Sequence, residues 1–316
     1  MTEQVPPNRH AVCARINPPG SPPRGRDAWE RLCGWLLCGP GILWLILFCG
    51  LPLLALLATS FCQRGPDGEI GLPLTGENYR RLAGFGELGF DAFYPAVLMR
   101  SAGLALGTTS LCAVIAIPVA LWLSRLAPAY KPAALMLVVI PFWTNLLVRT
   151  YGWQLILAPD SWLSRFLQAL GWLAPEEGLY PGWSAVFLGM VCDFLPFMIL
   201  PVYAAAERLD SRLMEAAVDL GANRWQAFRH AVWPQIKPGV TAGALLVFLP
   251  AMGQFVVPDL LGGARLMFLG NLLQQQFGPS RDWPFGAAIA SVALLLVLLA
   301  LWLRRGLSGP QPIARA

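Results

Sequence analysis

Long apolar segments without charged side chains recur along this chain, and short polar stretches separate them. A helix needs about 20 mostly apolar residues to cross roughly 30 Å of hydrocarbon. Two more apolar segments carry a single charge each, Arg149 within residues 133–157 and Asp193 within residues 182–205. The pattern therefore predicts an all-α integral membrane protein with six transmembrane helices. The charge-free segments are residues 32–63, 101–124, 238–258 and 283–303.

Composition and charge agree with a membrane protein. The 316 residues are 56% hydrophobic and 13% charged, whereas soluble domains are about one quarter charged. With the N-terminus placed in the cytoplasm, fifteen Lys and Arg residues lie inside and six lie outside. The positive-inside rule therefore predicts that both termini are cytoplasmic, N-in and C-in. The net charge of +5 is then a signal of topology rather than of nucleic-acid binding.

A polar, charge-mixed stretch at residues 215–239 lies between two of the apolar segments. Apolar residues at helical spacing predict a short amphipathic helix that ends near Gly221, where a left-handed conformation turns the chain. A second helix should follow and end at Pro234 and Pro238. By periodicity alone, a hairpin packed on lipid headgroups is the alternative interpretation. The apolar stripe of the second helix comprises Trp225, Phe228 and Val232.

This stretch resembles the EAA loop of permease subunits of bacterial ABC importers. That pattern is Glu-Ala-Ala, three residues, Gly, nine residues, and Ile-x-Leu-Pro. Ala231 stands where the family usually has Ile, and Trp233 stands where it has Leu. In that family the loop is the coupling helix that docks into a groove on the ATPase subunit, so the resemblance implies an ATPase contact here. The matching residues are Glu215, Ala216, Ala217, Gly221 and Pro234.

Further segments look like those of permease subunits from spermidine/putrescine ABC importers, and the likeness covers about residues 35–305. It implies the type I ABC importer permease fold, a place in the bacterial inner membrane, and uptake of polyamines. Gln254 stands where that family commonly has an acidic residue. The similar segments are residues 141–157, 194–210, 253–263 and 271–288.

The resemblance also implies a division of the chain and a set of partners. Residues 35–305 form the permease domain, with the coupling loop at 206–239, and a short cytoplasmic tail follows at 306–316. Residues 1–34 are rich in Pro and Arg and lack an apolar core, which predicts a disordered cytoplasmic tail. The expected partners are a second homologous permease, two ATP-binding cassette subunits and an extracytoplasmic substrate-binding protein.

The sequence offers no catalytic constellation. A phosphate-binding loop ends in Gly-Lys-Ser/Thr, and neither Lys131 nor Lys237 completes that motif. The two histidines, His10 and His230, lie in the tail and in the coupling loop, and no Cys-x-x-Cys spacing suggests zinc. We therefore expect no cofactor or metal on this chain, and we expect the partner ATPase subunits to use ATP and Mg²⁺.

Charged residues inside the membrane are the main candidates for the substrate pathway, because a charge costs at least about 2.5–3.5 kcal/mol to insert. Arg149 and Asp193 lie at similar depths, roughly 12 and 15 Å from the outer helix ends at 1.5 Å per residue. They either form a purely structural ion pair or line the pathway. Asn145 and Gln254 are candidates for hydrogen bonds between helices. The remaining candidates are Trp143 and Tyr151, and Asp259 facing the outer vestibule.

Other functions stay open at this point. The same architecture serves other small solutes or anions, and a secondary transporter driven by an ion gradient is a rival of a different class. A secondary transporter has no ATPase to receive an EAA loop. A membrane-embedded enzyme is disfavoured because the required side chains are missing.

Overall fold

The computed structural model describes residues 39–65, 70–72, 74–86, 89–174, 178–263 and 266–307. The chain forms two compact units that divide between Leu56 and Leu57. The predicted tail at residues 1–34 and most of the predicted C-terminal tail lie outside the described residues. The all-α class is confirmed, since only four two-residue strands accompany the helices among the described residues.

The first unit contains the beginning of an apolar helix over Gly39–Thr59. A π-helical turn lies directly before Pro52, and the N–H of Leu51 donates to the carbonyl of Ile46. A proline ring clashes with the carbonyl four residues earlier in a regular α-helix, and the wider π turn relieves that clash. The segments of this helix are η2 (Ile46–Gly50) and α2 (Leu51–Thr59).

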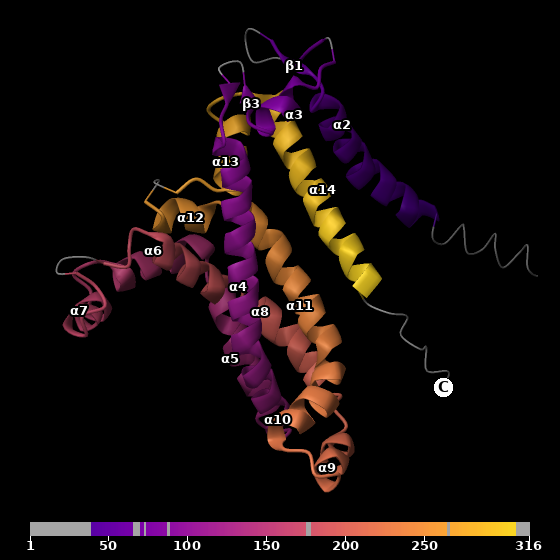
Figure 1. Cartoon of the computed structure of the whole chain (residues 1–316), viewed down its shortest axis with the longest axis vertical. Coiled ribbons are helices and arrows are strands. Elements are labelled where there is room, and N and C mark those ends of the chain that lie inside the picture. Colours follow the sequence, from indigo (N-terminus) through magenta and orange to yellow (C-terminus); the bar gives the residue numbers. More distant parts are fainter. Residues whose placement is uncertain are drawn as a thin grey trace, which may run out of the picture. The chain divides into compact units, whose positions relative to one another are not determined.

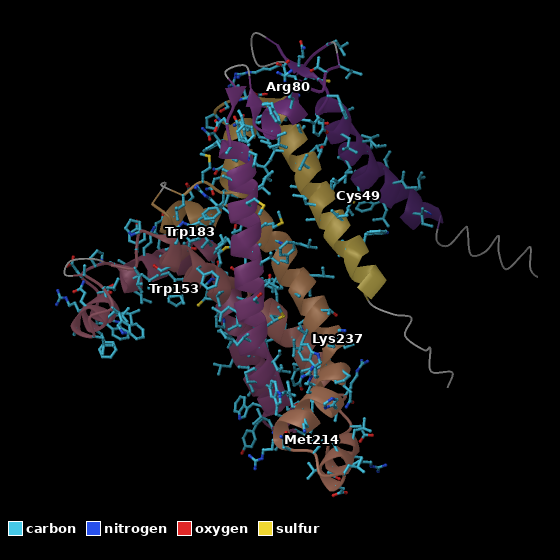
Figure 2. All side chains as sticks on the ribbon, in the orientation of Figure 1. Cys49, Arg80, Trp153, Trp183, Met214 and Lys237 are labelled. Atoms are coloured by element: carbon cyan, nitrogen blue, oxygen red, sulfur yellow. The ribbon has the colours of Figure 1, made fainter. Side chains whose placement is uncertain are left out.

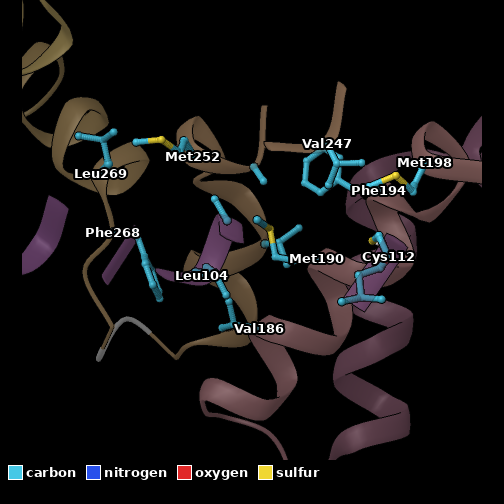
Figure 3. Packing of buried hydrophobic residues seen from close by; sticks show 14 of the residues in the cluster. Leu104, Cys112, Val186, Met190, Phe194, Met198, Val247, Met252, Phe268 and Leu269 are labelled. Carbon is cyan, nitrogen blue, oxygen red and sulfur yellow. Dashed lines mark hydrogen bonds between the residues drawn. The ribbon is translucent and has the colours of Figure 1, made fainter. Parts of the chain in front are cut away.

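Long helices form the core of the second unit, where α4, α8 and α11 pack against one another (Figure 1). Cys112 of α4, Met198 of α8 and Val247 of α11 are buried in this core (Figure 3). Apolar side chains on several faces of each helix allow such three-way packing. The long helices are α4 (Phe93–Ser124), α8 (Trp183–Ala206), α11 (Trp233–Gly253) and α14 (Trp283–Leu307).

The predicted third span is not one straight helix. It consists of α5 (Lys131–Trp143) and α6 (Leu146–Leu157). The helix axis bends by 89° between α5 and the helical stretch Leu146–Ala169, which begins with α6. Thr144 and Asn145 adopt extended backbone angles at the break. The short helix α7 (Trp162–Ala169) follows. The continuous crossing expected over residues 133–157 is therefore wrong, because the chain leaves helical geometry after Trp143.

Short elements gather at the end of the second unit that is remote from α9 and α10 (Figure 1). Arg81 forms an ion pair with Asp282 at 3.0 Å, and its guanidinium lies 4.1 Å from the ring centroid of Phe285. These contacts tie the segment before α4 to the start of α14. The elements are β1 (Gln63–Arg64), β2 (Ile70–Gly71), α3 (Glu77–Leu82), β3 (Phe85–Gly86), β4 (Gly89–Phe90) and α13 (Leu269–Phe277). Helix α12 (Val256–Leu261) packs on α6 and α8 instead.

The predicted coupling loop forms a helical hairpin at the other end of the unit. The sequence predicts that its second helix ends at Pro234 and Pro238. This prediction is wrong, because the helix continues into α11 as one helix over Arg224–Gly253. The π-helical turn before Pro234 explains the difference, because it removes the clash that would otherwise break the helix there. The hairpin consists of α9 (Ser211–Asp219), α10 (Arg224–Ala227) and η3 (Phe228–Val232).

Membrane crossings can be assigned by length and composition. Within the described residues, four helices are long and apolar enough to span a bilayer, or five if α5 and α6–α7 form one broken span. The apolar part of the last helix, Trp283–Leu299, is shorter than the others. Six spans and the N-in, C-in orientation therefore stay predictions.

Candidate functional site

The turn of the coupling hairpin is determined by local backbone geometry. Gly221 has a φ of 84°, the left-handed conformation that the sequence predicts there. The N–H of Gly221 donates to Val218 O at 2.9 Å, and the N–H of Ala222 donates to Ala217 O at 3.0 Å. These two bonds satisfy carbonyls that the end of α9 leaves free. Asn223 then caps α10, so the chain reverses within a few residues.

An apolar surface on this hairpin is exposed. Leu220 is 88% exposed and Trp225 is 68% exposed, and the side chains of Glu215 and Ala216 lie beside them in sequence on exposed positions. Ala217 is half-buried, and Pro234 is exposed at the base of the hairpin. Clustered exposed apolar residues are typical of a protein contact surface. The motif residues are therefore accessible to a partner.

The opposite face of the hairpin anchors it to the long helices. Val232 and Ile236 are buried in a cluster that includes Met214 of α9 and Ile117 of α4. Figure 2 shows Met214 at this end of the unit, while Arg80 lies at the remote end. Packed side chains thus connect α9 to α4 and α11.

An ion pair supports the base of the hairpin. Lys131 Nζ at the start of α5 lies 3.2 Å from Glu207 Oε1, directly after α8. Hydrogen bonds from Tyr203 and then Lys131 lower the pKa of the exposed Glu207 carboxyl. The Glu207 carboxylate is therefore charged at neutral pH and links the ends of two helices.

The predicted pairing of Arg149 with Asp193 is present. Arg149 Nε and Asp193 Oδ1 form an ion pair between α6 and α8, and the two side chains are 15% and 5% exposed. Arg149 Nη1 also donates to Pro141 O at 2.8 Å. Asp193 Oδ2 has no hydrogen-bond partner among the described residues. The guanidinium thus joins the two sides of the α5–α6 break to α8.

Three further candidates surround this break. Asn145 accepts a hydrogen bond from the N–H of Leu147 at 2.8 Å and so caps α6. Its hydrogen bond is therefore local, whereas the sequence suggested a bond between helices. Trp143 is 82% exposed and Tyr151 is 52% exposed on either side of the break. Both aromatic residues lie within six residues of Arg149 in sequence, and the structure leaves their rings on the surface.

A second break separates α11 from α12. Gln254 has an extended backbone, and its Oε1 accepts only from the adjacent N–H of Phe255 at 3.1 Å among the described residues. The expected bond between helices is therefore not formed by Gln254. Asp259 is exposed on α12 and lines a cavity of about 310 Å³. Figure 2 places Trp183, at the start of α8, close to α12.

Two sets of polar residues were missed from the sequence. Gln154 Nε2 donates to Leu260 O at 2.8 Å and connects α6 to α12. Asn271, Gln274 and Gln275 lie in α13 and line the cavity beside Asp259. The spacing of these three residues, i, i+3 and i+4, is a helix face and was a usable signal. Among the described residues, no group of His, Cys, Asp and Glu is suited to hold a metal ion.

Comparisons with known proteins point to transport. The model of the family "Binding-protein-dependent transport system inner membrane component" matches residues 44–308. The spermidine/putrescine transport system permease protein PotB of Haemophilus influenzae is 43% identical over 81% of this chain and 87% of its own length. PotB of Escherichia coli is 41% identical over 82% of this chain and 93% of its own length. The resemblance inferred from sequence motifs is thus confirmed.

Solved structures agree with the fold. A bacterial ABC transporter that imports the acidic polysaccharide alginate matches 90% of this chain and 99% of its own chain, with a TM-score of 0.58 and 16% identity. The same kind of transporter, in complex with an alginate pentasaccharide-bound periplasmic protein, matches with a TM-score of 0.55. At this identity the likeness supports the fold and says nothing of the cargo.

Proposed function

The chain belongs to the family of binding-protein-dependent transport system inner membrane components, and on that premise we propose that its cargo is putrescine and spermidine. It is an inner-membrane permease subunit of an ABC importer. The identity of the cargo is inferred from the 43% identity to a spermidine/putrescine permease over 81% of this chain. The alginate importers share the fold, so the fold by itself leaves the cargo open.

Uptake requires partners that this chain does not replace. We propose that it pairs with a second homologous permease, receives cargo from an extracytoplasmic binding protein, and is driven by two ATP-binding cassette subunits. Those subunits would bind ATP and Mg²⁺, because the chain has no Gly-Lys-Ser/Thr phosphate loop. Its own contribution is to form half of the pathway and to transmit the movement of the ATPases.

A reconstituted importer tests the cargo. The complete complex in liposomes, with ATP inside and binding protein outside, should accumulate labelled putrescine and spermidine. Alginate oligosaccharides and sulfate should neither be taken up nor compete. Uptake of neither polyamine by a complex whose ATPase is active would contradict the proposed cargo while leaving membership of the family intact.

The coupling hairpin is proposed to receive the ATPase subunit through Glu215, Ala216 and Ala217. Support comes from their exposure beside the apolar surface of Leu220 and Trp225. The buried cluster behind them connects the hairpin to α4 and α11. An ATPase that moves the hairpin would thereby tilt the helices that surround the pathway.

Substitution of Gly221 by Val tests this coupling. A Cβ at Gly221 meets no atom within 4 Å, so the substitution acts through backbone strain alone. An L-residue in the left-handed conformation costs about 1–2 kcal/mol, and relief of that strain would misdirect α10. We expect uptake and cargo-stimulated ATPase activity to fall several-fold while the amount of subunit in the membrane is retained.

Gly171→Val is the matched control. Gly171 also has a positive φ, 75°, with open space around it, but it follows α7 and is remote from the hairpin in sequence. It should have a similar backbone cost without uncoupling transport from ATP hydrolysis. Full transport and full ATPase stimulation in Gly221→Val would show that the hairpin is not the docking element.

A further inference from the structure

A cavity of about 310 Å³ between α12 and α13 lies at the end of α11 that is remote from the coupling hairpin. Its volume is at the lower end of the roughly 300–1,000 Å³ that ligand pockets occupy. Its lining combines hydrogen-bond acceptors with apolar carbon. The lining residues are Asp259, Leu266, Met267, Asn271, Gln274, Gln275 and Pro279.

We infer that this cavity is a binding site for the alkylammonium groups of the cargo, on the side from which cargo arrives. The inference rests on the proposed function. An ammonium group has three donors and needs acceptors. Among the described residues, this lining offers one carboxylate and three side-chain amides and no basic side chain. The apolar side chains of Leu266 and Met267 provide contacts for the methylene chain between two ammonium groups.

Asn271 is held in place as an acceptor. Its Nδ2 donates to Phe255 O at 3.3 Å, at the α11–α12 break. Its Oδ1 is buried and has no hydrogen-bond partner among the described residues. A buried acceptor without a donor is unfavourable, and a bound ammonium would remove that penalty. Because the amide nitrogen is already engaged, the oxygen cannot rotate away without breaking the existing bond.

Close packing fixes the helix that carries this acceptor. A Cβ at Gly270 would lie 2.6 Å from Gly253 O and 2.8 Å from Gln254 O, so α13 rests directly on the backbone of the break. Asn271 is the next residue along α13, and Asp259 extends from α12 on the other side of the break. Asn271 and Asp259 are therefore carried by α13 and α12, two helices that contact each other beside the break.

A larger cavity nearby has a different chemistry. It measures about 630 Å³ at the same end of the unit, and its lining includes the guanidinium groups of Arg64 and Arg81 together with Glu77 and Asp91. The two guanidinium groups offset the two carboxylates, so the described lining has no net negative charge to attract a polyamine. The described lining of the smaller cavity has a carboxylate and no cation, so it suits a polycation better.

Binding of labelled spermidine to the complete importer, without ATP and without binding protein, tests the inference. Asp259→Asn should weaken binding by about tenfold, the effect of losing one charge-assisted hydrogen bond. Asn271→Ala should also weaken it, because the buried acceptor is lost. Asp160→Asn, which neutralises an exposed carboxylate outside this cavity, should leave binding unchanged.

Uptake assays on the same variants distinguish an error in the proposed binding site from an error in the proposed cargo. If the wild-type importer accumulates spermidine but Asp259→Asn and Asn271→Ala bind it like Asp160→Asn, the site is wrong and the cargo is right. If the wild-type importer does not transport polyamines at all, the proposed function fails instead. Equal amounts of assembled complex, measured for each variant, exclude a folding defect as the cause.

Discussion

Two helical rods of this permease are interrupted, and the two breaks are closed by different chemistry. Between α5 and α6, Arg149 donates to Pro141 O at 2.8 Å and forms an ion pair with Asp193 of α8. Between α11 and α12, only neutral groups act among the described residues. There Asn271 donates to Phe255 O at 3.3 Å, and α13 packs on the backbone of the break.

The breaks lead into helices that touch. Gln154 of α6 donates to Leu260 O of α12 at 2.8 Å, and both helices pack on α8. Helix breaks at membrane depth are tolerated where other groups satisfy the freed backbone. At the first break, the charged Arg149 donates to a free backbone carbonyl, and its charge needs a counter-ion. At the second break, the neutral amide of Asn271 and close packing need no counter-ion. The first break therefore depends on one side chain of another helix, Asp193 of α8.

The largest loss of stability is expected when the ion pair between Arg149 and Asp193 is broken. Asp193→Asn leaves the guanidinium of Arg149 buried without a counter-ion, which costs about 3–5 kcal/mol. Membrane abundance and thermal unfolding of the complex should report a severe loss of folded protein. The double variant Arg149→Gln with Asp193→Asn should restore most of it, because no unpaired charge remains.

The same double variant sharpens the functional side of the comparison. If Asp193 lies on the polyamine pathway, the restored protein still transports poorly, and putrescine is affected less than spermidine because it carries fewer charges. Measured uptake of both cargoes decides this. Wild-type uptake by the double variant would assign the pair a structural role alone.

A smaller effect is expected at the neutral break. Gly270→Ala places a Cβ 2.6 Å from Gly253 O, and overpacking of this kind costs about 1–3 kcal/mol. The unfolding temperature of the purified complex should fall. Gly103→Ala in α4 is the control, since nothing lies within 4 Å of its Cβ and Ala favours the helix. Equal unfolding temperatures of the two variants would mean that packing of α13 does not stabilise the α11–α12 break.

The smallest effect concerns the cap of α6. Asn145→Ala removes the hydrogen bond to Leu147 N and should cost about 0.5–2 kcal/mol. Asn145→Asp retains a capping oxygen and should stay close to the wild-type unfolding temperature. If Ala were tolerated fully while Asp were destabilising, the side chain would serve something other than the cap.

The sequence by itself determined the features that depend on neighbouring residues or on overall polarity. Apolar runs of about 20 residues identify helices for a bilayer, and the left-handed turn at Gly221 follows from local backbone preference. The pairing of Arg149 with Asp193 was also within reach, because a single charge of each sign in an apolar region has few other partners.

Only the tertiary structure decided what the backbone does at the breaks. Pro234 does not end its helix, because the π turn before it removes the clash of the proline ring with the preceding turn. The continued helix packs against α4 and α8. Asn145 and Gln254 form local bonds, since the chain leaves helical geometry beside them. The cavity of Asp259 and Asn271 joins residues of separate helices, and no spacing along the chain specifies which helices pack together.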